Sequence, residues 1–202
     1  TAELNDQRLL VERRTTEQAH FVLGYPALKR SDERRPALSL LNVILGGNMS
    51  SRLFTEVREK RGLCYYVHSE ADFYHDMGLF GASAGVDPKR VEEAITVTLA
   101  EFAALADGSK PVTAVELQRA KDYITGKFVL DLEDSESVAQ YFGMKQLLLG
   151  EIETPDELLK KYLAVTLEEV NALAKEIIVK EKLRFAIIGP FEDKTIFERA
   201  MQ

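Results

Sequence analysis

The sequence predicts an α+β domain in which a mixed, largely antiparallel sheet is covered by helices on one face. Two observations lead to this prediction. Several short segments are continuously apolar or have apolar residues at every second position, which indicates strands. Longer segments have a helical apolar period, and some of them follow one another directly in the second half of the chain. A sheet accompanied by consecutive helices is typical of an α+β layer structure.

The length and composition are those of one folded domain. Of the 202 residues, 46% are hydrophobic and 29% are charged, which is ordinary for a globular protein and excludes disorder. A chain of this size buries roughly 70% of the surface that its unfolded form exposes, so it needs no disulfide or metal to fold. We therefore predict a single α+β domain over residues 1–202.

Charge and hydropathy exclude several classes of partner. The net charge of −7 makes nucleic acid an unexpected partner. No apolar run approaches the ~18 residues of a membrane helix, so no membrane segment is expected. The compartment stays open, with a soluble cytoplasmic or periplasmic protein expected if the source is bacterial. Because the chain begins at Thr1 without methionine, a processed or excised piece is expected.

The first half of the chain contains strands and two helices. An apolar run at 20–25, before a proline, predicts a strand. A helical period that begins after Ser31 and Asp32 and stops at a Gly-Gly pair predicts a helix over 31–45. A shorter helix is predicted over 50–62, and strands follow at 63–74 and 79–86 with a turn between them.

The predicted strand 63–74 has two distinct faces. One face carries Leu63, Tyr65, Val67, Ala71 and Phe73, and the other carries Cys64, Tyr66, His68, Glu70 and Asp72. This alternation places Tyr65 on the apolar side. In the next strand, Gly81, Ser83 and Gly85 leave one face almost without side chains. Glycine in a strand often marks close approach by another backbone, and a packed helix is the favoured neighbour here.

The second half is mostly helical. Asp87 followed by proline is typical of a helix start. Three later helices begin with a capping box, in which a threonine and a glutamate three residues later cap each other's backbone. These boxes are Thr113 with Glu116, Thr154 with Glu157, and Thr166 with Glu169. An apolar run at 183–188 predicts the last strand.

No side-chain pattern by itself reveals an active site. The three histidines, His20, His68 and His75, lack the spacing of zinc ligands. Cys64 is the only cysteine, which excludes an internal disulfide, and it is interpreted as a buried, inert thiol. The loop 46–51 lacks the ending of a phosphate-binding P-loop.

The acidic residues Asp131, Glu133, Asp134 and Glu136 are interpreted as solvated charges at the junction of two helices. Ser135 is the predicted cap of the second of these helices. A carboxylate pair or a hard-metal site is the alternative interpretation.

One long motif carries more information than these patterns. The segment 46–65 reads GGNMSSRLFTEVREKRGLCY. It resembles the signature of the non-catalytic C-terminal half of the insulinase/pitrilysin-like zinc metallopeptidases, the family that includes the mitochondrial processing peptidases. The rest of the chain is similar to this half in the order and length of its elements, so the resemblance covers essentially the whole chain.

The resemblance implies a division of labour between two similar halves that enclose a peptide. One half carries a His-x-x-Glu-His zinc motif and a distant glutamate ligand, and the other half binds substrate. The helix around 37–45 stands where the zinc ligands would lie, and it contains neither histidine nor glutamate. We therefore expect no catalytic residue and no metal in this chain alone. Zinc is expected in a catalytic partner half, in the same parent chain or another subunit.

The resemblance also implies a substrate-binding pair, Arg58 and Tyr65. A guanidinium fork and a phenol hydroxyl aimed at peptide carbonyls would hold the substrate and stabilise developing negative charge. Structural interpretations also exist, because Arg58 lies near the end of a predicted helix and Tyr65 on an apolar strand face. Tyr66 is the alternative assignment for the tyrosine.

The function that the resemblance implies is substrate binding within a zinc metalloendopeptidase that acts on enclosed peptides. The chain alone is then expected to be inactive, and a homo-oligomer is compatible with the sequence. The alternative is a structural scaffold domain, since the same family includes core subunits of a respiratory complex. The presence of both Arg58 and Tyr65 favours the peptidase interpretation.

Overall fold

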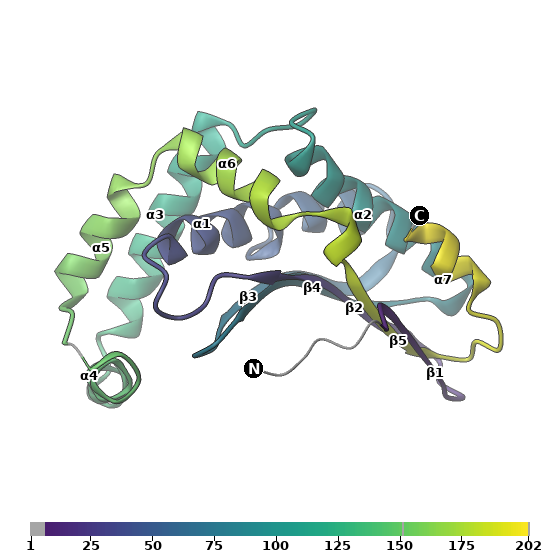
Figure 1. The fold of residues 1–202 in the computed structure, drawn as a ribbon, viewed down its shortest axis with the longest axis horizontal. Helices are drawn as coiled ribbons and strands as arrows, with labels where there is room; N and C mark the ends of the chain where they lie inside the picture. The colour runs from purple at the N-terminus through teal and green to yellow at the C-terminus, as the bar shows by residue number, and fades with distance from the viewer. Residues whose placement is uncertain (1–6, 151, 202) are drawn as a thin grey trace.

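A computed structural model describes residues 7–150 and 152–201 of the chain. Five strands form one sheet, and helices cover one of its faces (Figure 1). The strands are β1 (Leu9–Arg13), β2 (Ala19–Ala27), β3 (Cys64–Phe73), β4 (Gly78–Val86) and β5 (Arg184–Gly189). The predicted α+β class is therefore confirmed.

The strand order is β1-β5-β2-β4-β3, so β1 and β3 form the two edges in the described part of the chain. β1 and β5 are parallel, whereas every other neighbouring pair is antiparallel. The strands that are adjacent in sequence, β3 and β4, form the predicted hairpin. β3 thus lies at an edge with its full length paired to a single neighbour.

The helices form a layer above the sheet in Figure 1, with α1, α2 and α6 lying over the strands. The α-helices are α1 (Arg35–Gly46), α2 (Val91–Ala106), α3 (Ala114–Asp131), α4 (Ser135–Leu149), α5 (Pro155–Ala164), α6 (Leu167–Ile177) and α7 (Thr195–Ala200). Three short helical turns are η1 (Phe54–Glu59), η2 (Pro88–Arg90) and η3 (Lys180–Lys182). No helix among the described residues is both long enough and apolar enough to cross a membrane.

The hydrophobic core lies between the sheet and the helices. Alternate residues of β2 and β4 point into it, as a half-buried antiparallel sheet requires. Tyr25 and Phe80 each pack against Phe102 of α2, with ring centroids 5.5 and 5.6 Å apart. The opposite face of the sheet carries exposed side chains, such as His20 and Val22 of β2 and His68 of β3. We call this surface the open face.

Capping signals predicted three helix starts correctly, whereas α1 begins at Arg35, and not at the predicted residue 31, and it has no side-chain cap. All three threonine–glutamate capping boxes are present with both reciprocal hydrogen bonds. The cap of α4 differs from the prediction, because Asp134, and not Ser135, accepts a hydrogen bond from the backbone of Ser137. This bond lowers the pKa of Asp134, and Asp131 pairs with Lys127. The acidic segment is therefore a helix junction, as interpreted from the sequence.

Two elements, β1 and α7, were not predicted, and β2 extends further than predicted. β2 continues through Pro26 because its pairing with β4 extends that far. Its pairing with β5, on the other side, stops at Gly24. Proline removes one backbone donor, which is tolerated where a strand has a free edge. β1 is short, and β5, the strand it pairs with in the described part of the chain, is far away in the sequence.

The glycine that ends η1 offers a clean stability test. Gly62 has φ +56°, and an added Cβ would meet nothing within 4 Å. Gly62→Ala should therefore lose about 1–2 kcal/mol of unfolding free energy through backbone conformation alone. Gly143 of α4 has equally open surroundings and an ordinary helical backbone, so Gly143→Ala should gain up to about 1 kcal/mol. Urea unfolding of both variants measures the contrast, and equal effects would contradict it.

Candidate substrate-contact site

Arg58 lies in η1, which is a turn of π-helix and not the ordinary helix that the sequence predicts. The backbone N–H of Lys60 reaches the carbonyl of Thr55 at 3.0 Å, which closes one wide turn. Such turns are rare and occur frequently at functional sites. The Arg58 side chain is exposed, and its guanidinium carbon lies 5.2 Å from the centroid of the Phe54 ring.

A glycine turn joins η1 directly to β3. The N–H of Gly62 donates to the carbonyl of Arg58 at 2.9 Å, and the N–H of Leu63 donates to that of Val57 at 3.0 Å. The bond from Gly62 is the one by which a left-handed glycine commonly ends a helix. The bond from Leu63 spans six residues, one more than in the usual paired cap. The turn therefore fixes how the chain leaves Arg58 and enters the strand that carries Tyr65.

The other cations of the motif are held by carboxylates. Arg52 forms a two-pronged pair with Glu116, and its side chain is only 13% exposed. Lys60 and Arg61 both pair with Glu56, and these hydrogen bonds lower its pKa. Arg58 has no carboxylate partner among the residues that the structure describes. Arg58 is therefore the cation of this motif whose charge is not matched by a carboxylate of the described chain.

Tyr65 lies in a β-bulge, which corrects the prediction that it faces the apolar side of β3. Cys64 pairs with Val86 and Tyr66 pairs with Gly85, so Tyr65 is the extra residue between two consecutive pairs. Its side chain is left outside the ladder, and the residue is 57% exposed. Within the described chain its hydroxyl makes no hydrogen bond. A bulge re-aims side chains and is common near active sites.

Cys64 occupies the position on the helix-covered face that the prediction gave to Tyr65. It is half-buried against the core, and not fully buried as expected. Burial raises the pKa of its thiol, and the charge of Arg58 partly opposes this shift. The thiol therefore stays protonated at neutral pH.

Tyr66, the alternative assignment, is already engaged. Its hydroxyl and Nδ1 of His20 are 3.1 Å apart and share a hydrogen bond. Its ring lies over Gly85, where an added Cβ would come within 2.5 Å of the ring. The open space at this glycine is thus filled by a side chain of the neighbouring strand, and the packed helix favoured from the sequence is not its neighbour.

The open face carries a second polar group around His68. Its Nε2 lies 2.7 Å from Oε1 of Glu70 and 2.9 Å from Oγ of Ser83. A serine nucleophile with a histidine base needs its acid on the other ring nitrogen. Here both partners meet the same nitrogen, and Ser83 also donates to Glu70 at 3.0 Å. The arrangement therefore does not support nucleophilic catalysis.

The described residues do not fit a zinc ion. The middle of α1 is apolar, and Leu38, Leu40 and Leu41 are fully buried. No group of three or more histidines, cysteines, aspartates or glutamates within 7–150 and 152–201 is arranged to hold a metal.

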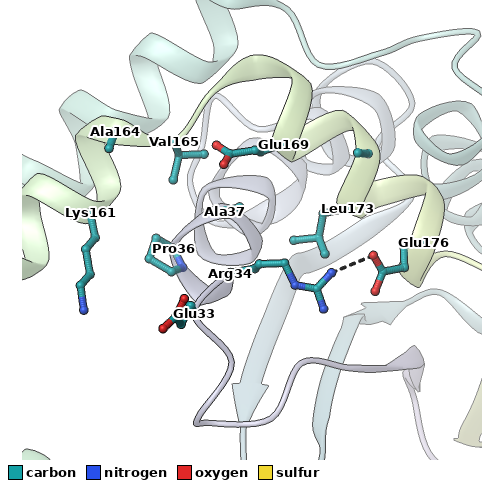
Figure 2. A pocket seen from close by; sticks show the side chains of 11 residues that line it. Glu33, Arg34, Pro36, Ala37, Lys161, Ala164, Val165, Glu169, Leu173 and Glu176 are labelled. Atoms are coloured by element: carbon teal, nitrogen blue, oxygen red, sulfur yellow. Dashed lines mark hydrogen bonds and ion pairs between the residues drawn. The ribbon is translucent and has the colours of Figure 1, made fainter.

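An apolar hollow among the helices lies elsewhere. A cavity of about 600 Å³ opens between the start of α1 and helices α5 and α6 (Figure 2). Its lining includes Pro36, Val165 and Leu173, and at its rim Arg34 donates to Glu176 at 2.8 Å. Asp32 holds the same guanidinium, and this hydrogen bond lowers the pKa of Asp32. The charge of Arg34 is therefore already paired with two carboxylates.

Comparison with known proteins gives a consistent family. Residues 1–124 match the family model described as the peptidase M16 inactive domain. A protein described as an uncharacterized zinc protease of Streptomyces coelicolor is 41% identical over 181 residues, which is 90% of this chain and 39% of the relative. The mitochondrial-processing peptidase subunit alpha of Pongo abelii is 27% identical over 193 residues, which is 90% of this chain and 36% of that protein.

Solved structures show the same fold. A peptidase M16 inactive domain from Pseudomonas fluorescens matches with a TM-score of 0.82 and 24% identity, over 92% of this chain and 43% of that one. A chain of complex III2 from Candida albicans matches with a TM-score of 0.82 and 19% identity, over 96% of this chain and 48% of that one. The chain spans about two fifths of the length of the curated relatives it matches.

The ion pair of Arg52 should carry stability and not substrate contact. Arg52→Ala leaves Glu116 partly buried without its cation, so we expect a loss of about 3 kcal/mol at neutral pH. Lys60→Ala, which breaks an exposed pair, should cost less than about 0.5 kcal/mol. Denaturant unfolding of both variants tests this difference, and similar losses would contradict it.

The Arg52 effect should also depend on pH. Burial raises the pKa of Glu116, but hydrogen bonds from Arg52 and Thr113 outweigh it and hold the pKa below the ordinary value of 4.5. A carboxyl group whose pKa is lowered by folding stabilises the fold at pH values above its unfolded-state pKa. This stabilisation is lost as the pH falls through the folded-state pKa. The free-energy difference between wild type and Arg52→Ala should therefore shrink in acid, and a constant difference would exclude the linkage.

Proposed function

The chain belongs to the peptidase M16 family as its inactive domain, and from this we propose that it is the substrate-binding half of a zinc metallopeptidase. In this proposal, Arg58 and Tyr65 contact the backbone of a bound peptide. A catalytic half with a His-x-x-Glu-His motif supplies the zinc and the catalytic residues. That half is part of the same parent chain or of another subunit.

One observation carries the proposal: among the described residues, Arg58 has no carboxylate partner and the Tyr65 hydroxyl has no hydrogen bond, and the two side chains lie at the two ends of a single turn. Arg58 is exposed and has no acidic partner among the described residues, whereas Arg52, Lys60 and Arg61 each have one. Tyr65 is extruded from β3 by the bulge. The neighbouring cations serve the fold through ion pairs, whereas the Arg58 guanidinium lies over the Phe54 ring and has no carboxylate among the described residues to satisfy its charge.

The chemistry of the pair suits a peptide backbone. A guanidinium presents a rigid set of donors that stays charged at every physiological pH, and a phenol adds one directional donor. Both match carbonyl oxygens, which every peptide offers regardless of its sequence. Donors held in place before the reaction also stabilise negative charge that develops on a carbonyl oxygen during hydrolysis. The proposal therefore gives this half a role in both binding and turnover.

The proposal is tested in the assembled protein that contains the catalytic half. Arg58→Ala and Tyr65→Phe should each lower kcat/KM for peptide hydrolysis by roughly 10²-fold, the usual cost of removing one donor at an oxyanion. Arg61→Ala is the matched control, because it removes a cation of the same motif that Glu56 already holds. The control should keep wild-type turnover.

Far-ultraviolet circular dichroism and the unfolding midpoint should be unchanged in both site variants, because the two side chains are exposed. Wild-type kinetics in Arg58→Ala and Tyr65→Phe would remove both residues from the site. Such a result would favour the alternative function, a scaffold domain of the same family.

The chain on its own should be inactive. Since α1 offers no ligand set for zinc, elemental analysis of the purified chain should find far less than one zinc per molecule, and a peptide assay should find no turnover. Addition of the catalytic half should restore both. Stoichiometric zinc and hydrolysis by the chain alone would contradict the division of labour between the halves.

A further inference from the structure

We propose that His20 and Tyr66 are positioning residues that hold Tyr65 outside the sheet. They act through the backbone of β3 and do not themselves touch the substrate. The inference rests on the proposed role of Tyr65 in peptide contact, and it adds two residues that the signature motif does not identify as functional. His20 lies on β2, two strands away from the edge strand that carries Tyr65.

The first step concerns the register of β3. Cys64 and Tyr66 pair with Val86 and Gly85, which are adjacent residues of β4 and therefore face opposite sides of the sheet. Two residues of β3 that flank a third would share one face in a regular strand. Here they occupy opposite faces, so the residue between them has no place in the ladder. Tyr65 is that residue, and its exposure follows from the two anchors beside it.

The second step concerns what holds the anchor on the open face. His20, Gly85 and Tyr66 form one row across β2, β4 and β3. The rings of His20 and Tyr66 are stacked, with centroids 6.0 Å apart and an angle of 26° between their planes. The Tyr66 ring can reach across β4 only because Gly85 has no side chain, since a Cβ there would also approach His20 Nδ1 within 3.2 Å.

The third step concerns the other anchor. Cys64 packs against the core from the helix-covered face, opposite the fully buried Val86. Cys64 stays opposite Val86 and Val67 opposite Ala84, so Tyr65 and Tyr66 compete for the one place opposite Gly85. If the contact that holds Tyr66 there is lost, Tyr65 can take this place and Tyr66 becomes the extra residue. The hydrogen bond between His20 and Tyr66 therefore stabilises the register that exposes Tyr65. A residue of β2 thus sets the position of a phenol on β3.

The experiment follows Tyr65 directly with 3-fluorotyrosine incorporated into the protein and ¹⁹F NMR, with Tyr65→Phe used to assign its signal. His20→Ala and Tyr66→Phe remove the two partners of the hydrogen bond, and Gly85→Ala displaces the ring by steric conflict. All three should shift or broaden the Tyr65 signal. His20→Asn, which keeps a hydrogen-bonding group near the place of Nδ1, should restore it. His75→Ala, an exposed histidine in the β3–β4 turn, is the matched control.

The kinetic readout separates positioning from a general loss of stability. In the assembled peptidase, His20→Ala and Tyr66→Phe should lower kcat by roughly tenfold or more with KM little changed, because the donor is misplaced and not removed. In a Tyr65→Phe background the same substitutions should cause no further loss. His20→Asn should recover most of the wild-type kcat.

Two results would overturn the inference. One is a Tyr65 signal that stays in place in both His20→Ala and Tyr66→Phe. The other is a kcat loss that is as large in the Tyr65→Phe background as in wild type. If Tyr65→Phe alone leaves turnover unchanged, the proposed function is wrong, and the fluorine signal still decides whether His20 and Tyr66 position Tyr65.

Discussion

The pairing of β3 with β4 is the constraint on which the arrangement of the candidate site depends. Two adjacent residues of β4, Gly85 and Val86, are matched by residues of β3 that are not adjacent, so one tyrosine must leave the ladder. Glycine at 85 lets an aromatic ring lie across the strand, and the buried valine at 86 demands a small apolar partner, which Cys64 provides. The exposure of Tyr65 follows from these two contacts, of Tyr66 with Gly85 and of Cys64 with Val86.

Electrostatic pairing sorts the basic residues of the motif into two groups. Arg52 is enclosed and also donates to the carbonyls of Lys110 and Pro111, so it joins the segment before α3 to the start of η1. Glu116 serves this pair and the capping box of α3 at the same time. Arg58, a few residues later, is also basic, but it forms no ion pair with any of the described residues. The motif therefore contains cations that stabilise the fold through ion pairs and, next to them in the sequence, one cation that does not.

Local signals in the sequence predicted most of the fold and missed the irregularities that shape the site. Capping boxes and the β3–β4 hairpin involve residues close in sequence, and all of these were found as predicted. β1 was missed because β5, its partner among the described strands, is more than a hundred residues away. A strict two-residue period put Tyr65 inside, since nothing in the period marks a bulge. The π-helical turn around Arg58 likewise has no signature in helical periodicity. Only the resemblance pointed to the two residues.

The proposed site is consequently marked by an unusual backbone conformation, whereas its side chains are of common types. Arginine and tyrosine are common on protein surfaces, and exposure alone does not distinguish these two. What distinguishes them is a wide helical turn, a left-handed glycine and a bulge within a dozen consecutive residues. If Arg58 and Tyr65 hold a peptide as proposed, selection must act on Gly62 and Gly85 as strongly as on the two contact residues. A related chain that kept the arginine and the tyrosine but replaced both glycines would then retain the motif without a working geometry.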